Sequence, residues 1–150
     1  VMDPITSINP PKDTTFAIML EAQRRDWEIY VLEQSDLWLL NGTVYARADR
    51  VSLHDKSEHW FDITDEIIAE LSDFNIILMR KDPPFNTEYI YTTYLLELAE
   101  AKGSKVFNKP QSLRDANEKL FAAWFPQCTP PTLVSRNEQQ LRDFIETHQD

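Results

Sequence analysis

Glycine is scarce: the chain of 150 residues contains only two, Gly42 and Gly103. A dinucleotide-binding loop of the Gly-x-Gly-x-x-Gly type and a P-loop both need clustered glycines, so the sequence contains neither motif. Each glycine also has a structural explanation, Gly42 in a tight turn and Gly103 at a helix end. The sequence therefore excludes a glycine-rich phosphate loop in this stretch. In a nucleotide-binding protein, we expect that loop to follow Asp150.

Cysteine, basic charge and long apolar runs are also in short supply. Cys128 is the one cysteine, in a PQCTPP loop, which excludes an internal disulfide and favours an incidental role over a reactive thiol. No run approaches the about 18 apolar residues of a membrane span, and VMDPITSINP does not resemble a signal peptide. A net charge of −10 argues against nucleic acid and anionic membranes as partners. We expect a cytoplasmic protein.

Metal and nucleophile motifs are missing too. The histidines His54, His59 and His148 are scattered, and no Cys/His spacing matches a zinc site. His54 and His59 share a polar loop, where a solvated role is the expected one. No Gly-x-Ser-x-Gly nucleophile turn exists. The sequence predicts no metal ligand and no catalytic residue in this chain.

The composition that is present, 42% hydrophobic and 27% charged, is typical of a globular protein. The chain opens with Val1-Met2, which resembles the end of a strand, and stops at Asp150 directly after an amphipathic helix. We interpret both ends as cuts and expect the chain to be the front part of a longer protein.

The first half predicts a helix, a strand and a hairpin. Asp13 can cap a helix over residues 14–26, and EIYVLE (28–33) is typical of a buried strand. Asn41-Gly42 joins two β-prone runs and predicts a β-hairpin, since both residues tolerate the positive φ angles of a tight turn. Residues 51–73 are mixed and charged, which indicates loop with a short helix near 64–71. The apolar side of the first helix is expected to use Phe16, Met19, Leu20 and Trp27.

A second strand–helix–strand unit follows. FNIILM (74–79) predicts a strand, Asn86 can cap a helix that runs to about Lys102, and SKVFN predicts another strand. Strand, helix, strand, hairpin, strand, helix, strand describes an α/β fold, with a mostly parallel sheet flanked by helices and a β-hairpin insertion. The inward face of this helix is expected to carry Ile90, Tyr94, Leu95 and Leu98.

The last segment begins a new unit. Ser112 and Asp115 resemble a capping box for a helix over 113–125, TLVS predicts a strand, and Asn137 can cap a final helix. We expect a boundary near residues 110–118, which gives a first domain at 1–115 and a second domain at 116–150.

A cationic turn follows the strand that ends at Met79. Arg80, Lys81 and Asp82 lie at its carboxyl end, which is the edge where open α/β sheets bind ligands, and Asp3 follows the first strand at the same edge. Two cations there could hold a carboxylate, Arg80 by a bidentate fork. The alternative is an Arg/Asp salt bridge that braces the loop, and composition alone favours that alternative.

Several long strings resemble one family. VMDPI, FAIMLEAQRR, ILMRKDPPFNTEYIYTTYLLE and NKPQSLRDANEKLFAAWF are similar to bacterial glutathione synthetases of the ATP-grasp superfamily, in register from Val1 to Asp150. The resemblance implies a Rossmann-like pre-ATP-grasp domain over residues 1–115. It implies that residues 116–150 are the first elements of an ATP-grasp domain.

The resemblance also implies an activity. The family joins γ-glutamylcysteine to glycine through an acyl phosphate, uses ATP with Mg²⁺ or Mn²⁺, and forms homotetramers. By the same resemblance Lys119 contacts ATP phosphate, and Arg80 binds the peptide carboxylate with Lys81 and Asp3 beside it. The metal ligands and the phosphate lid would follow Asp150, so the chain alone is expected to be inactive and to hold no cofactor tightly.

Two other classes of protein remain open. The fold suits a non-catalytic α/β domain that binds a small molecule, and exposed aromatic residues would suit an assembly module. We expect the tryptophans to be core residues instead. They are Trp27, Trp38, Trp60 and Trp124.

Overall fold

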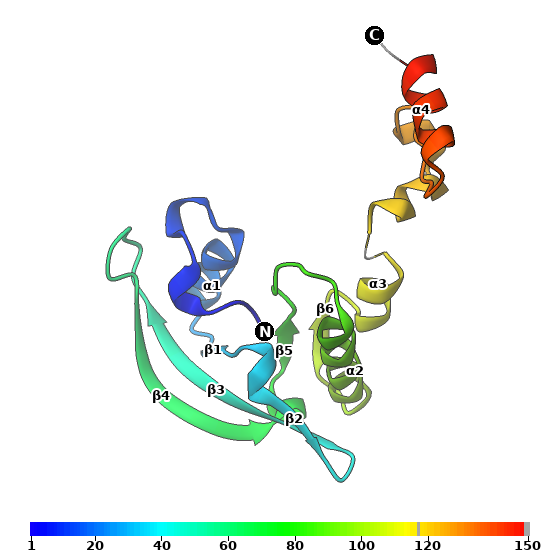
Figure 1. Ribbon diagram of the computed structural model, residues 1–150. Coiled ribbons are helices and arrows are strands. Elements are labelled where there is room, and N and C mark those ends of the chain that lie inside the picture. The colour runs from blue at the N-terminus through cyan, green and yellow to red at the C-terminus, as the bar shows by residue number, and fades with distance from the viewer. Residues whose placement is uncertain (117, 149–150) are drawn as a thin grey trace. The chain divides into compact units, whose positions relative to one another are not determined.

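A computed structural model of the chain describes residues 1–116 and 118–148. The chain forms two compact units, Val1–Arg114 and Asp115–Asp150. Figure 1 identifies the helices and strands of both units.

The larger sheet of the first unit is antiparallel. Its central strand is β3 (Thr43–Leu53), which pairs along one edge with β4 (Phe61–Glu70). Its other edge is shared by β1 (Ile29–Val31) and β2 (Leu37–Leu40). In Figure 1, β3 and β4 lie side by side as two long, curved strands.

The hairpin predicted at Asn41-Gly42 is confirmed. Leu40 pairs with Thr43 across the turn, and the two residues between them have φ angles of 50° and 80°. Asn and Gly reach this region at low steric cost, so the dipeptide sets both the turn and the register of β2 against β3.

A smaller parallel sheet contains the strands on which the candidate site depends. Strand β5 (Ile76–Leu78) pairs in parallel with β6 (Lys105–Phe107). The first residues extend this sheet: Met2 and Arg80 form a parallel bridge, and the Arg80 amide donates to the Val1 carbonyl at 2.8 Å. The Met2 amide donates to the Leu32 carbonyl at 2.9 Å, so Met2 connects the segment after β1 to the end of β5.

The predicted α/β class is confirmed, but the expected mostly parallel pairing is wrong. Among the described residues, β3 pairs antiparallel with β1, β2 and β4, whereas β5 and β6 pair in parallel. The strand predicted at 28–33 pairs antiparallel with β3 because β1 and β2 share one edge of β3 and the chain reverses direction at the β2–β3 hairpin. Parallel neighbours need a long crossover instead.

Strand β4 corrects the expected loop and short helix at 64–71. Its sequence FDITDEIIAE places acidic residues among the apolar ones, so it shows no sustained alternation of apolar and polar residues, and none of its residues is buried. The whole length of β3 offers it backbone partners, from Tyr45–Glu70 to Leu53–Phe61. Pairing with β3, which the local sequence does not reveal, therefore makes this segment a strand.

Helix α1 (Thr14–Arg24) begins as predicted. The Asp13 carboxylate accepts hydrogen bonds from the Thr15 amide at 2.6 Å and the Phe16 amide at 3.2 Å. Phe16 and Met19 are buried, but Trp27 is 52% exposed, so its predicted core position is wrong. The helix ends at Arg24 and the chain turns through Asp26 at a φ of 60°, which separates Trp27 from the helix face.

Helix α2 (Thr87–Ala101) is capped by Asn86 as predicted, but a different face is buried. Tyr94 and Leu98 are 48% and 41% exposed, so their expected core positions are wrong. The hydroxyls of Thr92 and Thr93 donate to the helix carbonyls of Glu88 and Ile90, which removes most of the cost of burying them. The buried face consists of Thr92, Thr93, Leu96 and Ala99.

Two hydrophobic clusters lie along β3. The first packs α2, β5 and β6 against residues 44–48, and the second packs α1 and Trp60 against residues 51–53. The buried positions of β3 change from even to odd numbers between Ala48 and Val51, where its register with β4 shifts. This irregularity bends the strand and lets one strand serve both clusters.

The remaining segments are short or lie in the second unit. Helix α3 (Pro110–Asp115) is followed by the 3₁₀ turns Lys119–Trp124 and Pro126–Cys128, and α4 (Glu138–Thr147) begins at the predicted cap Asn137. The expected helix over 113–125 is therefore wrong, and TLVS forms no strand in the described part of the chain because it has no pairing partner there. Earlier 3₁₀ turns cover Ile5–Ser7, Pro10–Lys12, Gln34–Asp36 and Leu71–Asp73.

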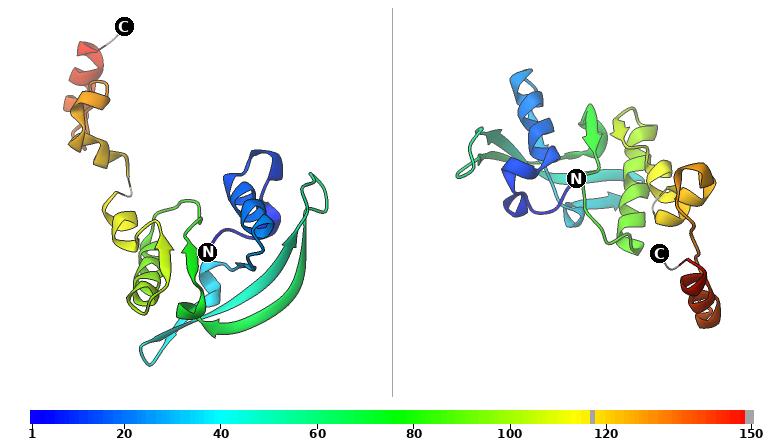
Figure 2. Two further views of the ribbon diagram at one scale, coloured as in Figure 1. Left: turned by 180° about the vertical axis from the view of Figure 1, so that it is seen from behind. Right: turned by 90° about the horizontal axis from the view of Figure 1, so that it is seen from above.

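Figure 2 shows the same elements from two further directions. Among the helices of residues 1–116 and 118–148, none combines the length and the apolar character that crossing a bilayer requires.

The buried face of α2 predicts that replacing two nearby leucines has different effects on stability. Leu96 is 0% exposed and Leu98 is 41% exposed, although only one residue separates them. We expect Leu96→Ala to lower the free energy of unfolding by about 2–5 kcal/mol, since it leaves a cavity in the first cluster. Leu98→Ala, the matched control, should cost less than about 1 kcal/mol. Urea denaturation measures both, and equal losses would contradict the observed face.

Candidate functional site

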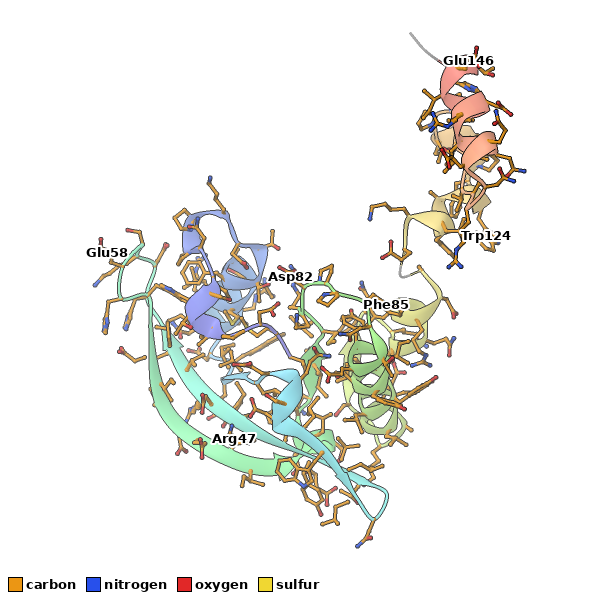
Figure 3. All side chains as sticks on the ribbon, viewed as in Figure 1. Arg47, Glu58, Asp82, Phe85, Trp124 and Glu146 are labelled. Carbon is orange, nitrogen blue, oxygen red and sulfur yellow. The ribbon has the colours of Figure 1, made fainter. Side chains whose placement is uncertain are left out.

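The parallel bridge between Met2 and Arg80 brings two loops to the same end of the small sheet. Asp3 follows Met2, and Lys81 follows Arg80, so these two side chains leave neighbouring chain segments at one edge. The Lys81 ammonium lies 2.8 Å from one Asp3 carboxylate oxygen, and the Asp82 amide donates to the other at 2.9 Å. The sequence-based placement of Asp3, Lys81 and Asp82 on one edge is confirmed. Figure 3 labels Asp82 in the loop that follows β5.

The Asp3–Lys81 pair braces the loop. The Lys81 side chain is only 19% exposed, and its ammonium also donates to the Asp82 carbonyl at 2.7 Å. Its charge is therefore already matched by a carboxylate. The alternative that composition favoured was a salt bridge between arginine and aspartate, but the ion pair that braces this turn joins Lys81 to Asp3.

Arg80 is held differently. Its guanidinium donates to the hydroxyls of Thr15 at 3.0 Å and Thr14 at 2.8 Å, at the start of α1. Neutral hydroxyls orient the group without cancelling its charge. Within residues 1–116 and 118–148, no carboxylate lies within 4.0 Å of it. Arg80 is exposed, so it is the cation of this turn that remains able to receive an anion.

The ionisation of Asp3 follows from these contacts. Burial pushes its pKa upward, but the hydrogen bond from Lys81, the Asp82 amide and the Lys81 charge outweigh burial, so the net pKa lies below its usual value. Asp3 is thus a carboxylate at neutral pH, and the brace is intact under those conditions.

A cavity of about 210 Å³ lies next to this edge, and Asp3 contributes to its wall. Five carboxylates and one guanidinium, that of Arg47, contribute to its wall. The carboxylate of Asp36 lies 2.7 Å from Arg47 and is the main cause of the raised pKa of Arg47. Neither Arg80 nor Lys81 lines this cavity, and its charge favours a cation over an acidic peptide. Its polar wall contains Asp3, Glu33, Asp36, Arg47, Asp49 and Glu66.

Lys119 belongs to the second unit. It opens the 3₁₀ turn Lys119–Trp124, not the α-helix expected there, and its side chain is 98% exposed. Glu118 caps that turn by accepting from the Lys119 amide at 3.3 Å, and its carboxylate lies 3.6 Å from the Lys119 ammonium. Among the described residues, Glu118 is the one ion-pair partner of this ammonium, which is otherwise open to solvent.

Sequence reasoning missed two groups of residues. Thr14 and Thr15, which orient Arg80, could have been suspected because the first turn of a helix after a strand lies near the same sheet edge. The second group is His54, His59 and Asp62, whose ligand-type atoms lie within 4.8 Å of one another. It was missed because the strand that carries Asp62 was expected to be loop.

The comparisons with known proteins cover the whole chain. Residues 1–114 match the model of the prokaryotic glutathione synthetase N-terminal domain, and residues 118–150 match that of the prokaryotic glutathione synthetase ATP-grasp domain. The chain is 54% identical over 150 residues to a glutathione synthetase of Escherichia coli (strain K12), covering 100% of this chain and 48% of that relative. It is 55% identical to that of Photorhabdus laumondii and 54% to that of Vibrio vulnificus, covering 48% and 47% of those proteins.

These matches define the class of protein: an α/β domain followed by the first part of an ATP-grasp domain. The chain belongs to the prokaryotic glutathione synthetase family. It spans about half the length of the curated relatives it matches.

The Asp3–Lys81 brace predicts a pH-dependent contribution to stability. Because the folded-state pKa of Asp3 lies below its unfolded value, the contribution is complete above about pH 4 and is lost as the pH falls through the folded value. Asp3→Asn should therefore lower the free energy of unfolding at pH 7 more than at pH 3. Urea denaturation at both values measures this.

The control is Asp55→Asn, which removes an exposed carboxylate that has no ion pair among the residues described. Its effect should stay within about 0.5 kcal/mol at both pH values. An Asp3→Asn effect of the same size at pH 7 and pH 3 would contradict the assigned pKa direction.

Proposed function

We propose that this chain forms the first domain and the opening of the ATP-grasp domain of an ATP-dependent ligase that joins γ-glutamylcysteine to glycine. The supporting observation is the identity of 54–55% along the complete chain to proteins named glutathione synthetase. We place the domain division at residues 1–115 and 116–150. In this assignment the carboxylate of the dipeptide is activated by ATP as an acyl phosphate, and the glycine amine displaces the phosphate.

Arg80 is the residue we assign to the peptide carboxylate. Its guanidinium is exposed, two threonine hydroxyls hold it in place, and no ion pair neutralises it within residues 1–116 and 118–148. A bidentate contact with a carboxylate would use the fork geometry of the group. The parallel bridge to Met2 fixes the backbone from which this side chain projects.

Lys81 and Asp3 are assigned to the substrate site in a different way. The ion pair at 2.8 Å commits each to the other, so we give them a positioning role that keeps the turn after β5 in its observed conformation. A substrate anion would have to break this pair to use Lys81 directly. Arg80 offers a contact without that penalty.

Lys119 is the residue we assign to an ATP phosphate. Its side chain is 98% exposed, which leaves the ammonium available to a polyanion, and its one ion pair, at 3.6 Å, is weak and on the surface. ATP and Mg²⁺ or Mn²⁺ are the cofactors that the family implies for the ligase. We assign no metal ligand of that chemistry to the residues of this chain.

We also propose a cytoplasmic homo-oligomer, with γ-glutamylcysteine, glycine and ATP as its small-molecule partners. The expectation that the tryptophans are core residues is correct for Trp60, at 7% exposure, and wrong for Trp27, Trp38 and Trp124. Trp38 stacks on Tyr45 at 5.7 Å on the β2–β3 hairpin, where Leu39 and Leu40 are also half exposed. Such a surface supports contact with a second copy.

The proposed activity is tested in a protein that carries this chain together with the rest of the family's ATP-grasp domain. We expect phosphate release that requires ATP, Mg²⁺, glycine and γ-glutamylcysteine together. Arg80→Ala should raise the KM for the dipeptide about 10- to 150-fold, because it loses a charged hydrogen bond of about 1.5–3 kcal/mol.

The matched control is Arg25→Ala at the opposite end of α1, where the arginine forms a surface pair with Glu21 at 2.8 Å. Its KM should stay close to the parent value, since such pairs contribute little. An unaltered KM in Arg80→Ala would remove Arg80 from the peptide site, and absence of dipeptide-dependent turnover in the parent would refute the proposed reaction.

Lys119→Ala in the same protein should weaken ATP binding about tenfold or more, because a phosphate loses a charged partner. Isothermal titration calorimetry with ATP and Mg²⁺ measures the change. Arg142→Ala is the control, because it also removes one cation from the second unit, where Arg142 pairs with Glu138 along a helix face. Equal nucleotide affinities in parent and Lys119→Ala would refute the assignment.

A further inference from the structure

Two histidines and an aspartate converge where β3 and β4 are joined. His54 follows β3, His59 lies in the connecting loop, and Asp62 is on β4. The Nε2 of His54 lies 2.7 Å from Asp62 Oδ2, and the Nε2 of His59 lies 3.1 Å from Asp62 Oδ1. In Figure 3, Glu58 marks this loop at one end of the β3–β4 hairpin.

The loop is built on a rigid base. The His54 amide donates to the Trp60 carbonyl at 2.8 Å, which closes the connection between the strands. Trp60 is buried and packs edge-on against Phe16 at 5.1 Å, so the base of the loop is fixed to the second hydrophobic cluster. The two imidazole rings are stacked, with centroids 6.0 Å apart and an angle of 11° between their planes.

The backbone of His59 also adopts an unusual conformation. Its φ angle is 48°, in the left-handed region that residues with a side chain adopt at a steric cost. Such conformations persist where other contacts hold them, and they are frequent at ligand sites. Here the Asp62 carboxylate receives both imidazoles, so the loop holds three potential ligands together.

We propose that His54, His59 and Asp62 form a binding site for a divalent transition-metal ion, with Zn²⁺ as the simplest example. Two imidazole nitrogens and a carboxylate oxygen are ligands that zinc, cobalt and nickel prefer, whereas Mg²⁺ prefers oxygen alone. Three protein ligands leave the fourth position of a tetrahedral ion for water or another donor. This site is independent of the proposed ligase chemistry and of its Mg²⁺.

The observed distances fit such an ion after small side-chain movements. Tetrahedral bonds of about 2.0–2.2 Å place neighbouring ligand atoms about 3.4 Å apart. The three ligand atoms here all lie within 4.8 Å of one another. The His59 side chain is 79% exposed and can rotate without disturbing the core. Each Nε2 would bind the ion as an unprotonated nitrogen, with the ring proton on Nδ1.

The charges also favour a cation. The Asp62 carboxylate supplies a negative charge beside both imidazoles, at 2.7 Å from His54 and 3.1 Å from His59. With neutral imidazoles the three groups carry one negative charge, in a protein with a net charge of −10. Metal binding would tie the end of β3 to β4 across the loop and should raise the thermal stability of the first unit.

The test uses the tag-free 150-residue chain with Cys128→Ser, because Cys128 is exposed and its thiol could bind zinc separately. Titration calorimetry with ZnCl₂ should show one ion per chain, and a large excess of Mg²⁺ should not displace it. His59→Gln and Asp62→Asn should each weaken zinc binding at least tenfold. The control His148→Gln, which alters a histidine of the second unit, should leave the affinity unchanged.

A second measurement keeps the proposal testable if a variant unfolds. In the unmutated cluster, histidine ring resonances of His54 and His59 should shift on addition of zinc while those of His148 do not, and Co²⁺ should give the visible absorption of a four-coordinate ion. Zinc affinity that is equal in His59→Gln and its parent, or ring resonances that do not respond, would show that the cluster is only a pair of His–Asp contacts and would overturn the proposal.

Discussion

The parallel bridge between Met2 and Arg80 is the interaction on which the arrangement of the candidate site depends. It joins the first residues of the chain to the end of β5, while the Met2 amide reaches the Leu32 carbonyl after β1. Backbone pairing fixes where each strand ends, and therefore where the next side chain begins. Asp3 and Lys81 consequently meet, and Arg80 reaches the first turn of α1.

The two cations at this edge, Arg80 and Lys81, differ in their availability to a ligand because their partners differ. Lys81 faces a carboxylate and Arg80 faces two hydroxyls, so two adjacent cations with similar sequence context are not equivalent. The neighbouring cavity is dominated by carboxylates, which repel an acidic ligand. An anion drawn to this protein, whose net charge is −10, therefore needs a local cation, and Arg80 supplies one.

The long β3–β4 hairpin has two functions in the fold. Along its length, β3 supports both hydrophobic clusters, and the register shift between Arg50 and Val51 adapts its buried side chains to each. At its end, the closed loop brings His54 and His59 to Asp62. A pairing that stabilises the sheet thus also positions three polar side chains that are separated in sequence.

Features that depend on neighbours a few residues apart could be predicted from the order of the amino acids. Asp13 and Asn86 cap their helices, Asn41-Gly42 makes the turn, and long motifs indicate the family. Three other features became visible only in the folded chain: the buried face of α2, the strand at residues 61–70, and the side chains that meet at Arg80 and Asp62. Those outcomes depend on backbone partners and packing supplied by distant segments, whose free energy exceeds the local preference of any short stretch.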